Sequence, residues 1–150
     1  MSEAILEPDV SLPFPIEFLI RDTPRSHQGK NPKAKEQWKQ KVGTIAKAHV
    51  GALKEFFFLD DRALAATIFY FPDGAMDGDV DNIVKLIVYG MVAIIYPNDQ
   101  LLERIIVQKF EPGIVSVFRS LTSTLERATE TQPPVLYIRI DDDLRWREVS

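Results

Sequence analysis

The apolar run over residues 83–95 constrains the fold more than any other feature, because Lys85 is its only charged side chain. The run predicts a helix over residues 82–95 that is apolar on almost every side. Such a helix must be buried on more than one face. The chain has 150 residues and a hydrophobic content of 45%, which is enough for one good core. We therefore expect one domain built around this helix.

The other hydrophobic patterns predict four strands and two more helices. The strands are expected over residues 16–20, 65–71, 104–110 and 135–140, and the helices over residues 34–53 and 114–128. In the first of these helices Trp38, Val42, Ile45 and His49 would share one face. Strands that alternate with helices predict an α/β (α+β) fold, a small mixed β-sheet packed with helices in a single domain over residues 1–150.

Acidic residues are crowded just before the apolar run. The sequence FPDGAMDGDVDNIVK over residues 71–85 carries Asp73, Asp77, Asp79 and Asp81 before its first basic residue, Lys85. Like charges a few ångströms apart resist ionising together, and a divalent cation relieves that repulsion. In an extended chain Asp79 and Asp81 would point to the same side, and Asp81 would be the N-cap of a helix beginning at Asn82.

A third carboxylate, Asp99, follows the apolar run in the turn-like segment 96–99 and can return to the same end of the molecule. Three carboxylates suit Mg²⁺ or Mn²⁺, which prefer oxygen ligands. Lys85 lies four residues after Asp81, on the same helical face, and would point at the metal. The simpler interpretation also stays open: Asp81 is then a helix cap and Lys85 its i,i+4 partner. A calcium loop is excluded, because Asn82 and Val88 occupy positions that require Gly and Glu.

The longer pattern resembles the RusA-type Holliday junction resolvases, the crossover junction endodeoxyribonucleases. It consists of DVDNIVK over residues 79–85, the Asn98-Asp99 turn and a strand ending near Lys109. The resemblance covers residues 13–111, with a weaker match to the strand 135–140. It implies metal ligands at Asp79, Asp81 and Asp99 and a catalytic lysine at Lys85. It also implies a homodimer that uses Mg²⁺ (or Mn²⁺) to cut four-way DNA junctions by phosphodiester hydrolysis.

Three departures from the family pattern keep a second hypothesis open. The family's paired aspartates are here Asn98-Asp99, the loop 74–78 lacks the basic residues common in the family, and residues 112–134 look like an insertion. The alternative is a catalytically weakened RusA-like dimer that binds branched DNA or a protein partner without cutting. A third hypothesis is an acidic metal-binding module unrelated to DNA.

The net charge of −4 argues against a general nucleic-acid binder, yet the charge is unevenly distributed. Basic residues dominate residues 21–54, where Asp22 and Glu36 are the only acidic ones. A basic surface beside an acidic metal site suits phosphodiester chemistry, although lysine-rich helix faces are often only solvated surface. The residues assigned to DNA binding are Arg21, Arg25, Lys30, Lys33, Lys35, Lys39 and the distal Lys109.

The absence of cysteine excludes disulfides, thiolate zinc sites and a cysteine nucleophile. No charge-free stretch is long enough to span a bilayer, and the acidic N-terminus does not match a secretory signal. We expect a cytoplasmic protein with flexible termini and no membrane partner.

Overall fold

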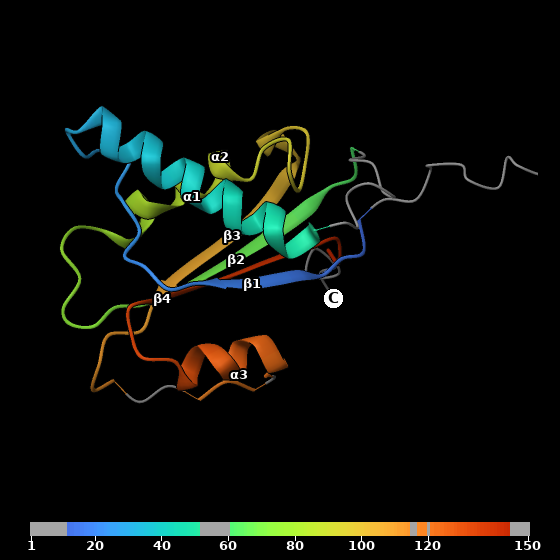
Figure 1. Ribbon diagram of the computed structural model, residues 1–150. Helices are drawn as coiled ribbons and strands as arrows, with labels where there is room; N and C mark the ends of the chain where they lie inside the picture. Colours follow the sequence, from blue (N-terminus) through green and yellow to red (C-terminus); the bar gives the residue numbers. More distant parts are fainter. Residues whose placement is uncertain (1–11, 52–60, 115–116, 120, 145–150) are drawn as a thin grey trace, which may run out of the picture.

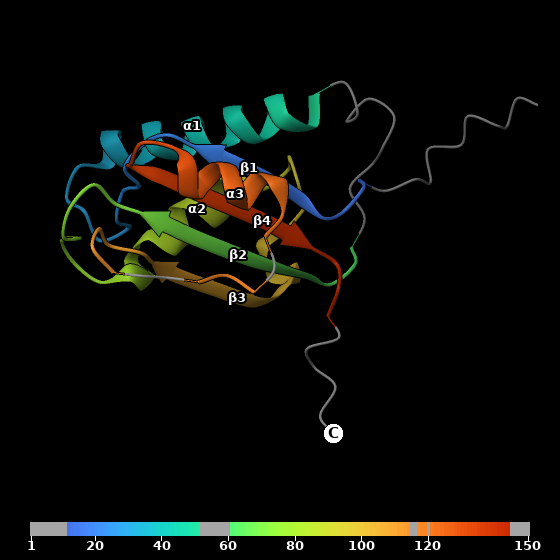
Figure 2. The ribbon, with the colours of Figure 1, turned by 90° about the horizontal axis from the view of Figure 1, so that it is seen from below.

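The fold is a four-stranded mixed sheet with helices on both faces (Figures 1 and 2). The computed structural model describes residues 12–51, 61–114, 117–119 and 121–144. In chain order its elements are β1 (Ile16–Ile20), α1 (Pro32–Val50), β2 (Leu64–Phe71), the 3₁₀ helix η3 (Val80–Ile83), α2 (Val84–Gly90), the 3₁₀ helix η4 (Asp99–Leu101), β3 (Leu102–Lys109), α3 (Ser123–Glu130) and β4 (Val135–Asp141). The predicted fold class and all four strands are confirmed, with β1 at its predicted bounds.

The strand order is β1-β4-β2-β3. β4 pairs antiparallel with both β1 and β2, and β2 pairs parallel with β3. β2 alternates buried and half-buried residues, as expected for a strand whose two faces meet different layers. β4 is buried on both faces from Val135 to Ile138, because it lies inside the sheet and is covered from both sides.

Two separate cores follow from the two covered faces. On one face α1 and α2 pack over residues such as Ile68 and Ile138, and Leu86, Ile87 and Val88 of α2 are buried there. On the other face Leu125 and Ala128 of α3 pack on Val135 and Tyr137. The apolar helix is therefore buried against both α1 and the core over the sheet, which agrees with its expected burial on more than one side, while its residues Lys85 and Tyr89 stay exposed.

The helix predicted over residues 82–95 is shorter than expected. η3 leads into α2, and α2 ends at Gly90, after which the chain turns back through residues 91–96. The buried Tyr96 hydroxyl donates to the Val88 carbonyl oxygen at 2.6 Å, which satisfies an acceptor that a longer helix would use internally. Ala93 has a φ of 69°, incompatible with a continuing helix.

The helix predicted over residues 114–128 is also wrong in extent. α3 begins only at Ser123, and residues 117–119 are not helical. Thr122 is the N-cap: its hydroxyl oxygen accepts from the Leu125 N–H at 3.1 Å and donates to the Glu17 carboxylate at 2.6 Å. Tyr137 donates to the same carboxylate. Thr122 thus caps α3, and Glu17 of β1, far away in sequence, holds the capping hydroxyl in place.

α1 begins at Pro32, two residues before its predicted start, because Asn31 caps it through the Ala34 N–H at 3.1 Å. Its predicted end at Leu53 lies outside the described residues, as do most residues of both termini. His49 is exposed, while Trp38, Val42 and Ala46 are buried. Within the described part of the chain, no helix has the length and apolarity needed to cross a membrane.

Candidate functional site

The paired aspartates lie on η3, at the end of the loop that follows β2. Asp79 is its N-cap residue, with extended backbone angles, and its side chain makes no capping hydrogen bond. Asp81 lies in the first turn and is exposed. The predicted N-cap at Asp81 is therefore wrong by two residues, because the tighter 3₁₀ turn begins the helical segment earlier. Neither the Asp79 nor the Asp81 carboxylate makes a hydrogen bond that caps the helical segment.

The predicted catalytic residues line two adjoining cavities. One cavity, of about 520 Å³, is lined by Asp81, Lys85 and Asp99. A second, of about 390 Å³, is lined by Asp79. Asn82 lines both cavities and so separates Asp79 from the other two carboxylates. Among the described residues, no group of three His, Cys, Asp or Glu side chains is arranged to hold a metal ion.

His27 also lines the cavity of Asp81 and Asp99, although no sequence pattern assigned it to the site. Its backbone N–H and its ring Nδ1 both lie 3.0 Å from the carbonyl oxygen of Asn82. Since a carbonyl only accepts, Nδ1 must carry the proton. Lys35 Nζ in turn donates to the His27 carbonyl oxygen at 3.0 Å. The basic loop after β1 is therefore attached to the aspartate segment, a contact that no local sequence pattern signals.

Asp99 begins η4, where Asn98 is the N-cap and its side-chain oxygen accepts from the Gln100 N–H at 2.7 Å. The amide at position 98 thus stabilises the turn that presents Asp99. Burial raises the pKa of the neighbouring Tyr96, and the charge of Asp99 raises it further. Tyr96 accordingly stays protonated and keeps its hydrogen bond to α2.

Lys109, at the end of β3, is connected through Glu111 to the loop between β2 and η3. Its ammonium pairs with the Glu111 carboxylate at 3.0 Å, and the same oxygen accepts from the Met76 N–H at 2.8 Å. The Met76 hydrogen bond, followed by the bond and charge of Lys109, lowers the pKa of Glu111. These contacts fix the middle of the loop between β2 and η3.

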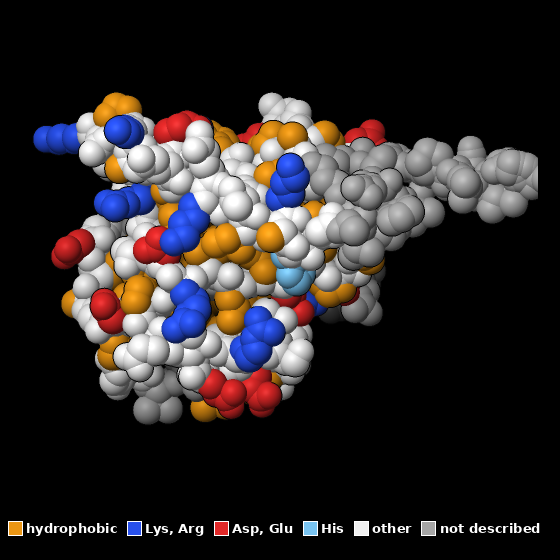
Figure 3. Space-filling model, viewed as in Figure 1, with side chains coloured by type: hydrophobic (Ala, Val, Ile, Leu, Met, Phe, Trp, Pro, Cys, Tyr) orange, Lys and Arg blue, Asp and Glu red, His pale blue; other side chains and the backbone are white. Residues whose placement is uncertain are grey.

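The other residues assigned to DNA binding lie on the loop after β1 and on α1. Arg21, Arg25, Lys30 and Lys33 are exposed, and Arg25 lines the Asp79 cavity. Lys39 pairs with Glu36 at 3.1 Å. Figure 3 shows Lys and Arg side chains spread over the face that carries α1, with acidic side chains among them. The basic region is therefore a dispersed surface interrupted by ion pairs.

Part of the chain matches the model of a known protein family. The model of the family described as Endodeoxyribonuclease RusA matches residues 20–117. This range includes all three predicted metal ligands, Lys85 and His27, and it stops before α3 and β4. Comparison with curated proteins gave no match.

Proposed function

Because the chain belongs to the RusA endodeoxyribonuclease family, we propose that it cuts Holliday junctions by Mg²⁺-dependent phosphodiester hydrolysis. The observation that carries the proposal is the cavity shared by Asp81, Lys85 and Asp99. Two carboxylates and one ammonium, from η3, α2 and η4, line this one open cavity. This combination of charges suits a phosphate whose charge increases in the transition state.

The donor set fits a hard divalent cation. Mg²⁺ is commonly held by one or two carboxylates together with water and substrate phosphate oxygens. Asp81 and Asp99 would hold the ion, and Asp79, which is not used in capping, would support it from the other side of Asn82. When bound, Mg²⁺ (or Mn²⁺) supplies a Lewis acid and lowers the pKa of a coordinated water.

The other contributions to binding and catalysis would come from side chains of the protein. Lys85, exposed on α2, offsets the negative charge that develops on the phosphate. His27 holds the backbone of Asn82 and so fixes the segment between Asp81 and α2. The exposed basic residues of the loop after β1 bind the phosphate backbone of the junction beside this segment. As a homodimer, the protein would present two such sites to a substrate with two-fold symmetry.

One observation favours a second candidate function, a RusA-like dimer that binds branched DNA without cutting. The Asn98 side chain is an amide engaged in capping η4, so this position offers no carboxylate for a metal. Such a protein would bind junctions with the same basic surface and leave them intact. Asn98→Asp, which keeps the capping acceptor, would then restore cleavage.

The proposed activity is tested with a labelled synthetic four-way junction, incubated with Mg²⁺ and separately with EDTA. We expect nicked duplex products with Mg²⁺ only. Asp81→Asn should abolish cleavage and leave junction binding intact or stronger, because it removes a ligand and also a charge that repels phosphate. Intact junction after incubation with Mg²⁺ or Mn²⁺, despite specific binding, supports the non-cutting alternative. Full cleavage by Asp81→Asn contradicts the assigned site.

A further inference from the structure

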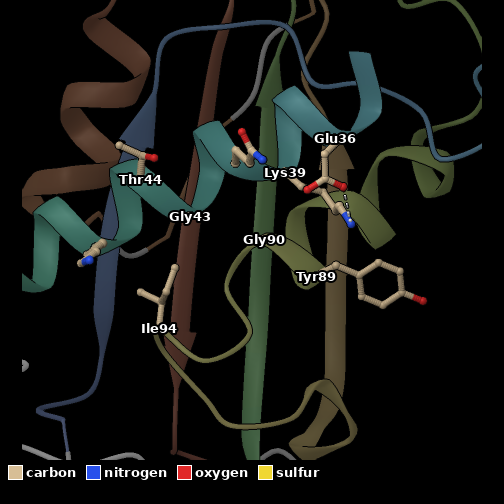
Figure 4. Close-up of a pocket in the computed structure, with 9 residues that line it drawn as sticks. Glu36, Lys39, Gly43, Thr44, Tyr89, Gly90 and Ile94 are labelled. Carbon is tan, nitrogen blue, oxygen red and sulfur yellow. Dashed lines mark ion pairs between the residues drawn. The ribbon is translucent and has the colours of Figure 1, made fainter. Parts of the chain in front are cut away.

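A groove of about 440 Å³ runs between α1 and α2, separate from the two cavities described above (Figure 4). Its floor is formed where Gly43 and Gly90 face each other. A Cβ at Gly90 would lie 2.8 Å from the Lys39 carbonyl oxygen, and one at Gly43 would lie 2.9 Å from the Gly90 carbonyl oxygen. The absence of side chains at both positions lets the helices touch, and it leaves an open channel between the longer side chains on either side.

The α1 wall of this groove is basic. Lys39 and Lys47 flank Gly43 at four-residue spacing, so they lie on one helix face about 12 Å apart along the axis. Thr44 adds a hydroxyl between them. Glu36 pairs with Lys39 at the surface, where the Glu36 side chain is exposed and that of Lys39 is half-buried, so a phosphate can replace the carboxylate at little cost. The wall therefore presents two cations to a polyanion.

The opposite wall connects the groove to the candidate active site. Tyr89 of α2 lines the groove and also the cavity of Asp81, Lys85 and Asp99. Tyr89 is 45% exposed, and Figure 4 shows its ring pointing outward from α2. An exposed tyrosine at the junction of two surface hollows offers a flat face to a base or sugar. Sequence and structure give it no role in the core.

We propose that the groove between α1 and α2 holds one DNA strand as it leaves the cleavage cavity, with Lys39 and Lys47 on its phosphates and Tyr89 stacked on the nucleotide next to the cut. The inference rests on the proposed function and adds a strand path to it. It assigns new roles to Lys47 and Tyr89. A branch point suits the tyrosine, because bases there are already partly unstacked and stacking on an aromatic ring is sequence-tolerant.

Four variants test the path: Lys47→Gln, Tyr89→Ala, Tyr89→Phe and, as a charge-matched control, Arg127→Gln. Arg127 lies on α3, on the other face of the sheet, and loses the same single charge. The affinity of each variant for a four-way junction is measured at several salt concentrations. Ca²⁺ replaces Mg²⁺ in these measurements so that the junction is not cut. Circular dichroism checks that each variant is folded. Sedimentation measures the mass of each variant in solution and so its oligomeric state.

If a strand occupies the groove, Lys47→Gln should reduce the log-log salt slope by about 0.9, the loss of one phosphate contact. Tyr89→Ala should weaken binding at least about 5-fold, which corresponds to the loss of one base stack, while Tyr89→Phe retains wild-type affinity. Arg127→Gln should keep the wild-type slope.

Two results would overturn the path while the proposed function stands. The first is junction binding and salt slope unchanged in Lys47→Gln and Tyr89→Ala. The second is a change in the oligomeric state of these variants, detected as a change of the mass measured by sedimentation. Such a change would mean that the groove is an interface between copies of the chain. A wild-type protein that neither binds nor cuts junctions removes both the proposed function and the path.

Discussion

Because α1 and α2 cross closely, the effect of Gly90→Ala on the stability of the protein can be predicted from the structure. The new Cβ would lie 2.8 Å from the Lys39 carbonyl oxygen and 2.9 Å from the Val42 Cβ, and neither atom is the end of a flexible side chain. The two helices must separate by about 0.6 Å to restore an ordinary contact of 3.4 Å. Gly90 has no positive φ, so alanine meets no backbone strain of its own.

Two opposing effects decide the magnitude. Replacing glycine by alanine in a helix stabilises it by at most about 1 kcal/mol, and less at the last residue of α2. Overpacking a close contact costs about 1 to 3 kcal/mol. We therefore expect a net destabilisation of about 1 to 2 kcal/mol, which lowers the melting temperature by roughly 2 to 8 °C in a domain of this size.

Thermal and urea denaturation followed by circular dichroism measure the effect. Gly74→Ala is the matched control, since its Cβ would meet no atom within 4 Å and its φ is not positive. This control should change stability by less than about 0.5 kcal/mol. A Gly90→Ala protein as stable as the control would refute the reasoning, and it would show that the helices do not cross as closely as described.

Three further predictions concern the site. Lys85→Ala should lower the single-turnover cleavage rate by about 10² to 10³ with little loss of junction binding; a rate within a few-fold of wild type would leave Lys85 as an ordinary surface charge. Glu111→Gln should destabilise the loop that contains Met76 at neutral pH. Because the folded-state pKa of Glu111 is lowered, its stabilisation is present above the unfolded value of about 4.3 and is lost as the pH falls through the folded value. Urea titrations of wild type and variant should therefore converge in acid, and a gap that persists there would contradict the assignment. Reversing Lys30 and Lys33 to Glu should flatten the salt dependence of junction binding by about 0.9 per lost phosphate contact, whereas an unchanged slope would limit these residues to solvated surface.

The secondary structure was predictable where the signals are local. The β1 bounds follow from a short apolar run between Ile16 and Ile20 that is interrupted only by Glu17, a pattern that needs no partner to be recognised. The start of α1 is encoded in Asn31 and Pro32, a cap and a first-turn proline, although the prediction began two residues later. Strand and helix existence were therefore clear, and their ends less so.

The misjudged ends involve hydrogen bonds to side chains outside the helices themselves. α2 stops where the Tyr96 hydroxyl returns to the Val88 carbonyl, and α3 starts where Thr122 meets Glu17 of β1. The Tyr96 hydroxyl satisfies a carbonyl at the end of α2, and the Glu17 carboxylate accepts from the Thr122 hydroxyl that caps α3. Hydrophobic periodicity extended both predicted helices too far because it contains no information about such partners.

The sequence by itself determined the family of this protein. The spacing of Asp79, Asp81 and Lys85 and the turn at Asp99 sufficed to predict a RusA-type site, and the family match over residues 20–117 confirms the family. Only the tertiary structure decided the grouping, in which Asp81 and Asp99 line one cavity and Asp79 another, with His27 bound between them at Asn82. The physical reason is that residue types and short spacings are local properties of the chain. The sharing of a cavity depends instead on how β2, α2 and β3 pack, and on the close crossing that Gly43 and Gly90 permit.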